Sequence, residues 1–184
     1  MNRLVMIGVA AAALSLSQAA SADGIKIGIT ISQTGPGASL GIPQAKTVPL
    51  LPKEIAGQSV EYIVLDDGSD ATKAVANARK LVTDEKVDAL VGGSVTPASI
   101  ALVEVAAETK TPFISLAGSS AVISPMDDKK KWAFKSPQND ALMAAAIADH
   151  MAKKGAKSVG FIGFAASKKF WEWTSVVPGA TSFK

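Results

Sequence analysis

The 184-residue sequence contains no cysteine and only one histidine, and aromatic residues make up 5% of it. Without cysteine the chain forms no disulfide, no thiolate nucleophile and no cysteine-ligated metal site, so packing alone must hold the fold. The single histidine, His150, lies in a segment rich in lysine and alanine, which is typical of a solvated surface. The net charge of +3 is small and argues against a nucleic-acid partner.

The N-terminal segment has the composition of a secretory signal peptide. Arg3 is followed by an uncharged apolar run over Leu4–Leu16, and Ala20-Ser21-Ala22 forms a small-x-small cleavage site. The apolar run is shorter than the roughly 20 residues of a membrane-spanning helix, which disfavours an uncleaved anchor. We therefore expect cleavage after residue 22 and an exported, soluble mature chain.

Strand and helix patterns alternate through the next hundred residues. Alternating isoleucines and near-continuous apolar runs predict strands, and helical spacing of apolar residues predicts helices. The predicted strands cover 25–31, 60–65, 87–91 and 113–116, and the predicted helices cover 42–55, 71–83 and 97–109. Pro49 and Pro52 should kink or break the first helix. This order indicates an α/β fold with a doubly wound parallel sheet.

The pattern changes after Leu116. Residues 117–131 are predicted to be irregular, and 132–134 to form a strand that crosses out of the first sheet. A helix over 139–154 and a strand over 159–164 would begin a second α/β lobe. The predicted organisation is a signal peptide at 1–22, an N-terminal ligand-binding lobe at 23–134, and an incomplete second lobe with an atypical tail at 135–184.

In an open doubly wound sheet, ligands bind at the carboxyl ends of the strands, where loops 32–41, 92–96 and 117–120 are expected. In the second of these loops, two glycines precede Ser94, Val95 and Thr96, and Pro97 suits the first position of a helix. Hydroxyls beside free amides at a helix N-terminus favour a small carboxylate. The alternative is that Ser94 or Thr96 merely caps the helix.

The third loop offers hydroxyls at Ser119 and Ser120 and carbonyls around Gly118, which accept hydrogen bonds from an ammonium group. Together the two loops would hold an α-amino acid, although the third loop is also compatible with an ordinary polar turn.

Other chemistry lacks support, because the sequence has no Walker A lysine, no G-x-S-x-G elbow and no dinucleotide fingerprint. The spacing of three aspartates is similar to that of a calcium-binding loop: Asp66, Asp67 and Asp70. Asn77 occupies the position at which such a loop needs glutamate, so we interpret the aspartates as turn residues.

Several segments in this order resemble the substrate-binding proteins of branched-chain amino-acid ABC transporters, which are type I periplasmic binding proteins. The segments are Ile25-Lys26-Ile27-Gly28-Ile29, Thr34-Gly35-Pro36-Gly37-Ala38, Val91-Gly92-Gly93-Ser94-Val95-Thr96-Pro97-Ala98, Pro112-Phe113-Ile114-Ser115-Leu116-Ala117-Gly118-Ser119 and Trp132-Ala133-Phe134-Lys135-Ser136-Pro137-Gln138-Asn139-Asp140. The resemblance covers roughly residues 24 to 164 and implies a two-lobed α/β protein with its ligand in the cleft.

The resemblance also implies site residues and partners. The segment Ser94-Val95-Thr96 would bind the ligand carboxylate, and Ala117-Gly118-Ser119 would bind its ammonium through the Ala117 carbonyl and the Ser119 hydroxyl. Leu40 would approach the ligand side chain. The implied protein is a periplasmic, monomeric, non-enzymatic carrier without metal or cofactor, which serves a membrane permease. The alternatives are a binder of another solute such as an amide, urea or aromatic acid, a receptor sensor domain, a secreted hydrolase, or a truncated fragment without function.

Overall fold

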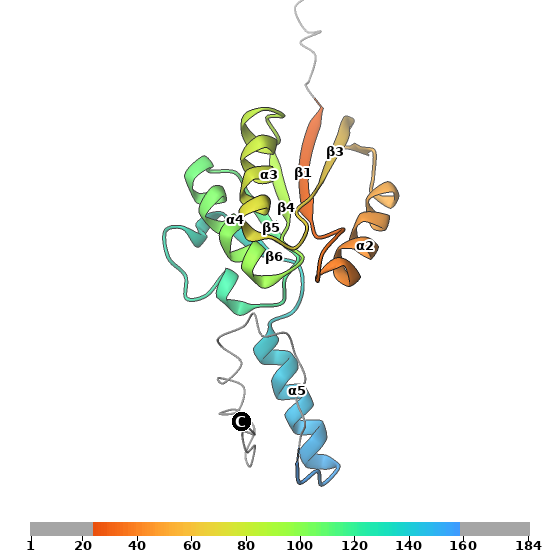
Figure 1. Cartoon of the computed structure of the whole chain (residues 1–184), viewed down its shortest axis with the longest axis vertical. Helices are drawn as coiled ribbons and strands as arrows, with labels where there is room; N and C mark the ends of the chain where they lie inside the picture. The colour runs from red at the N-terminus through yellow and green to blue at the C-terminus, as the bar shows by residue number, and fades with distance from the viewer. Residues whose placement is uncertain (1–23, 159–184) are drawn as a thin grey trace, which may run out of the picture.

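The fold is built on one twisted sheet, seen in a computed structural model that describes residues 24–158 (Figure 1). In this part of the chain the sheet has the strand order β2-β3-β1-β4-β5-β6. All neighbouring strands run parallel except β2 and β3, which are antiparallel. The strands are β1 (Ile25–Ile31), β2 (Glu54–Ile55), β3 (Gln58–Asp66), β4 (Ala89–Gly92), β5 (Phe113–Ser115) and β6 (Ala133–Lys135). The predicted α/β class with a parallel sheet is confirmed.

The helices α3 (Ala71–Thr83) and α4 (Thr96–Thr109) connect successive parallel strands. The bounds of α3 agree with the predicted helix, because Asp70 supplies the expected cap and accepts a hydrogen bond from the Lys73 amide at 2.7 Å. α4 begins with Thr96 and has Pro97 in its first turn, where a missing amide hydrogen costs nothing.

The first helix is displaced from its predicted bounds. α2 spans Ala38–Thr47, so it begins inside the segment predicted to be a loop. It starts there because the Gly37 carbonyl already accepts hydrogen bonds from the amides of Leu40 and Gly41. The expected break is confirmed, since α2 ends before Pro49 and a 3-10 turn, η1 (Val48–Leu50), leads to β2.

The core lies between one face of the sheet and the helices α3 and α4. Leu90 of β4 and Phe113 of β5 point to this face, and both are fully buried against residues such as Leu81 and Leu102. Figure 1 shows α2 on the other side of the sheet, beside β1. On that side, Ile114 and Phe134 are register partners on β5 and β6 and remain 39% and 55% exposed.

The prediction that residues 132–134 cross out of the first sheet is wrong. β6 pairs in parallel with β5, so it extends the same sheet. Between the two strands the chain passes over α4, where Val122 is buried in the core and Lys129 forms an ion pair with Glu104 at 2.7 Å. This packing returns the chain to the end of the sheet at which the parallel strands begin. A local sequence pattern does not reveal such a path.

The last described element is α5 (Asp140–Lys153), which extends away from the sheet (Figure 1). It confirms the helix predicted over 139–154, and His150 on it is exposed, as expected. The predicted signal peptide and the strand predicted over 159–164 lie outside the described residues. Among residues 24–158, no helix combines the length and the apolar character needed to cross a membrane.

Candidate functional site

The parallel strands place the candidate loops at the same end of the sheet, where the strands have their carboxyl ends. The chain proceeds from β1 to β3 in one direction and from β4 to β5 in the other, so the order reverses at β1 and β4. This reversal is where open α/β sheets bind ligands. A hydrogen bond of 3.0 Å from the Ser32 amide to Ser94 Oγ joins the loops that follow β1 and β4. The structure therefore brings Ser94 to the switch point of the sheet.

The turn between β4 and α4 depends on a glycine at position 93. Gly93 has φ +66°, and a Cβ there would overlap with the hydroxyl of Ser99 and lie 2.7 Å from the Ser99 Cα. No side chain fits in this conformation and this space, so the turn brings the chain close to the first turn of α4. Ser94 follows immediately, and it is only 4% exposed.

Neither hydroxyl caps α4, so the capping alternative for Ser94 and Thr96 is wrong. The N-cap residue is Val95, which has no side-chain acceptor, and the first turn contains no acidic residue. Within residues 24–158, neither a capping side chain nor an acidic residue of its own first turn compensates the positive end of this 14-residue helix. Ser94, Val95 and Thr96 together present a site that suits an anion.

The Ser94 hydroxyl contacts a residue that the sequence patterns did not identify. It donates a hydrogen bond of 2.5 Å to Oε1 of Gln44, a half-buried residue of α2. Leu40 precedes Gln44 by four residues, so the two side chains lie on the same face of α2. Leu40 is 50% exposed, which leaves it available for contact with a ligand near Ser94.

A buried pair of serines connects this loop to the loop after β5. Ser99 Oγ donates to the Gly93 carbonyl at 2.8 Å and lies 2.7 Å from Ser115 Oγ. Ser115 Oγ in turn accepts from the Ala117 amide at 3.1 Å. Both hydroxyls are fully buried, so this relay fixes the spacing between the two candidate loops. In the sequence, the signal for this relay is the presence of two small polar residues, Ser99 and Ser115, within otherwise apolar elements.

The loop after β5 is attached to α5 through the Gly118 carbonyl and through the Ser120 amide, which donates to Asp140 Oδ1 at 3.2 Å. The Gly118 carbonyl accepts hydrogen bonds from Lys135 Nζ at 2.5 Å and from the Asp140 amide at 3.2 Å. Burial lowers the pKa of Lys135, and the Asp140 carboxylate opposes this shift. Because both of its acceptor positions are used, the Gly118 carbonyl serves the loop itself. Ser119 Oγ accepts from the Ala121 amide at 3.3 Å and so caps the 3-10 turn Ser120–Val122, which leaves one of its lone pairs and the Ala117 carbonyl as candidate acceptors for a ligand.

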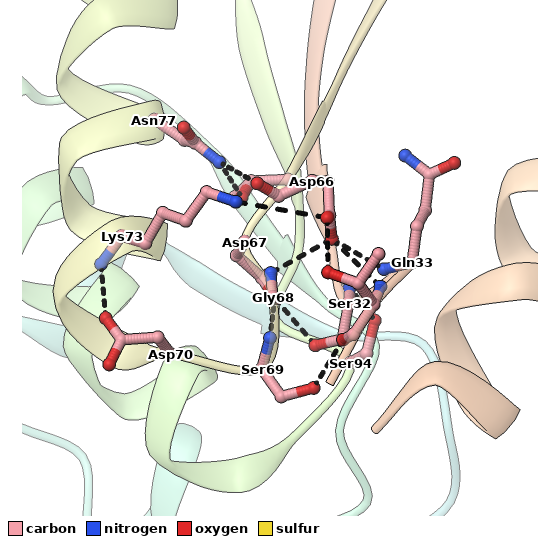
Figure 2. Close-up of polar contacts among 12 residues, drawn as sticks. Ser32, Gln33, Asp66, Asp67, Gly68, Ser69, Asp70, Lys73, Asn77 and Ser94 are labelled. Carbon is pink, nitrogen blue, oxygen red and sulfur yellow. Dashed lines mark hydrogen bonds and ion pairs between the residues drawn. The ribbon is translucent and has the colours of Figure 1, made fainter. Parts of the chain in front are cut away.

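Two adjacent aspartates at the end of β3 anchor the loop after β1 (Figure 2). Asp66 accepts hydrogen bonds from the amides of Gln33, Thr34 and Gly68 and from the Thr34 hydroxyl, at 2.6 to 3.1 Å. Asp67 is fully buried and accepts from Ser32 Oγ at 2.7 Å. The interpretation of these aspartates as turn residues agrees with these contacts. Within residues 24–158, no group of three or more histidine, cysteine or acidic side chains is placed to hold a metal ion.

The pH dependence of stability should report on Asp66. Its hydrogen bond from the Thr34 hydroxyl, with smaller contributions from the backbone amides, lowers the pKa of Asp66 to about 2. The unfolded chain binds this proton at its ordinary pKa near 4, so the stabilisation is complete above about pH 4 and is lost as the pH falls from about 4 to about 2.

We expect Asp66→Asn to flatten the acid limb of the stability profile, measured by urea unfolding at a series of pH values. Asp128→Asn, at a carboxylate that is 93% exposed, is the matched control. If the profile of Asp66→Asn keeps the wild-type acid limb, other carboxylates cause the loss.

Comparison with known proteins decides the family. The family model described as periplasmic binding protein matches residues 24–169. This chain belongs to the periplasmic binding protein family. Its members bind solutes and are not enzymes. The match includes all the candidate residues, from Leu40 to Ser119. A comparison with curated proteins finds no match.

Solved structures similar to this chain include an extracellular ligand-binding receptor and two solute-binding proteins. It is 51% identical to an extracellular ligand-binding receptor from Rhodopseudomonas palustris HaA2, with a TM-score of 0.80 over 84% of this chain and 44% of that one. A solute binding protein of an ABC transporter from Rhodopseudomonas palustris BisB5, in complex with 3,4-dihydroxy benzoic acid, is 27% identical (TM-score 0.68, 74% and 38% covered). A leucine binding protein from Thermotoga maritima MSB8 is 26% identical (TM-score 0.62, 73% and 39% covered). The chain thus spans less than half the length of these proteins.

Proposed function

We propose that the protein captures a small amino acid of the branched-chain type in the periplasm and delivers it, as a monomer, to the permease of an ABC transporter. The observation that carries the proposal is the pairing of two neighbouring loops, one after β4 at the switch point of the sheet and one after the adjacent strand β5. One loop presents the Ser94 hydroxyl beside the uncapped N-terminus of α4. The other offers the Ala117 carbonyl, at a residue that the buried serine relay holds, and the Ser119 hydroxyl, which the Ala121 amide orients.

The chemistry of the two loops matches the two ends of an α-amino acid. A hydroxyl donor and helix amides stabilise a carboxylate, and carbonyl and hydroxyl oxygens accept from an ammonium group. Leu40, half exposed on the face of α2 that also carries Gln44, suits an aliphatic side chain. The similarity to the leucine binding protein from Thermotoga maritima supports the same class of ligand. Residues 1–22 would direct the export of the chain.

A second candidate ligand is an aromatic acid. The similarity to the Rhodopseudomonas palustris protein in complex with 3,4-dihydroxy benzoic acid favours it. An aromatic acid would use the same carboxylate site at Ser94 but has no ammonium group for Ala117 and Ser119. The two candidates therefore differ in the second loop and share the first.

Amide chemical-shift mapping on the whole 184-residue chain tests the proposal, because it detects weak complexes as well as tight ones. L-Leucine should shift the amides of Ser94, Thr96 and Ser119, whereas 3,4-dihydroxybenzoate should shift the first two and leave Ser119 in place. If neither acid shifts the loop between β4 and α4 in the folded chain, the proposed function is wrong.

A further inference from the structure

The donor capacity of Ser94 is already used within the protein. Its hydroxyl accepts from the Ser32 amide at 3.0 Å and donates its single proton to Gln44 Oε1 at 2.5 Å. With Ser94 only 4% exposed, the oxygen has little room for further partners. A ligand carboxylate that takes a hydrogen bond from Ser94 must therefore replace Gln44 Oε1 as the acceptor.

Close packing of α2 against the loop after β1 sets the position of Gln44, so this residue does not behave as a free surface side chain. Gly41 lies against the backbone of Ser32, where an added Cβ would overlap with the Ser32 carbonyl. One turn further on, Gln44 reaches Ser94, which the Ser32 amide also contacts. At the start of α2, the Gly37 amide donates to Ser69 Oγ at 2.8 Å, which holds the first turn in place. Ser32 therefore holds both partners of the Gln44–Ser94 contact.

A primary amide can serve both states of such a site. Its oxygen accepts and its nitrogen donates, and a half turn about the last side-chain bond exchanges the two atoms. After this exchange, Gln44 Nε2 would donate to the remaining lone pair of Ser94 Oγ, and the Ser94 hydroxyl would then donate its hydrogen bond to the ligand. A carboxylate side chain at position 44 has no donor at neutral pH and adds a like charge beside the ligand carboxylate.

We propose that Gln44 is a positioning residue that directs the Ser94 hydroxyl towards a ligand carboxylate and confines this site to anionic or neutral hydrogen-bond acceptors. The inference rests on the proposed function, because it needs a carboxylate at Ser94. A polar residue on a surface helix does not by itself suggest such a role in ligand selection. Its neutral amide compensates the change of hydrogen-bond partners when the ligand binds.

Two variants separate this role from a merely structural one. Gln44→Met keeps the length of the side chain without hydrogen bonding, and Gln44→Glu keeps the shape but removes the donor and adds charge. For L-leucine, followed by amide shifts on the whole chain at pH 7, we expect affinity to fall by a factor of about 3 to 10 in Gln44→Met and by more than about tenfold in Gln44→Glu. Lys46→Met, at an exposed position of the same helix, is the matched control.

The pH profile gives the decisive readout. Partial burial and the neighbouring ligand carboxylate raise the pKa of the carboxyl group that Gln44→Glu introduces above its ordinary value near 4.3, and its protonation restores a neutral donor and acceptor. The affinity of Gln44→Glu should therefore recover between about pH 6 and about pH 4.3, while that of Gln44→Met should not. Equal affinities in the wild type and Gln44→Met, tighter binding by Gln44→Met, or no recovery in Gln44→Glu would overturn the inference. If the wild type itself shows no shifts around Ser94, the proposed function fails and the inference fails with it.

Discussion

Gly41→Ala should destabilise the folded lobe by about 3 kcal/mol. A Cβ at this position would overlap with the carbonyl oxygen and carbon of Ser32 and lie 2.9 Å from the amide nitrogen of Gln33. These atoms belong to the backbone, so they cannot move aside as a flexible side chain would. Overpacking of this kind typically costs about 1–3 kcal/mol and occasionally more. Urea unfolding monitored by circular dichroism measures the loss.

The matched control is Gly118→Ala. The nearest atom to an added Cβ there is the Gln138 carbonyl oxygen at 3.9 Å, which is an ordinary van der Waals distance. We expect a change of no more than about 0.5 kcal/mol in this variant. If Gly41→Ala were as stable as Gly118→Ala, α2 would not be seated on Ser32, and the position assigned to Gln44 would lose its basis.

Asp67→Ala should also cost about 3 kcal/mol. The side chain is fully buried, and its Oδ1 accepts from Ser32 Oγ at 2.7 Å and from the Ser69 amide at 2.9 Å. Truncation leaves both donors without this partner and opens a cavity beside the loops that hold the site. Hydrogen bonds to charged groups contribute roughly 1.5–3 kcal/mol each, and breaking a buried charged contact costs about 3–5 kcal/mol.

Asp67→Asn should cost less than about 1 kcal/mol, and this contrast tests the reason for the effect. The second carboxylate oxygen, Oδ2, is buried and has no hydrogen-bond partner among the described residues. Asparagine keeps the accepting Oδ1 and removes a buried charge that is only half satisfied. If thermal unfolding shows Asp67→Asn to be as unstable as Asp67→Ala, the charge itself, and with it the second oxygen, is needed for the fold.

Local patterns predicted those elements whose ends are determined locally. The strand over residues 25–31 follows from alternating isoleucines, and α3 begins and ends where Asp70 and the apolar spacing place it. The parallel pairing of β6 with β5 was missed because it depends on how residues 117–131 pack across α4. That path is a tertiary property with no periodic signature.

The candidate site shows the same division. Two glycines before Ser94 indicated a close turn at the start of a helix, and the structure places this turn at the switch point of the sheet. Gln44 was not identified, because a polar residue on a helix is normally solvated and only the packing of Gly41 on Ser32 brings it to Ser94. A contact between residues as far apart in the sequence as Gln44 and Ser94 cannot be inferred from a local pattern.

The central claim is that Ser94 and the N-terminus of α4 hold the carboxylate of a ligand, and a cycle of two changes tests it most directly. Ser94→Ala removes the hydroxyl, and L-leucinamide in place of L-leucine removes the negative charge of the ligand. We predict that Ser94→Ala weakens the binding of L-leucine by a factor of about 10 or more and has a much smaller effect on L-leucinamide. Equal losses for both ligands, or unchanged binding of L-leucine by folded Ser94→Ala, would contradict the account.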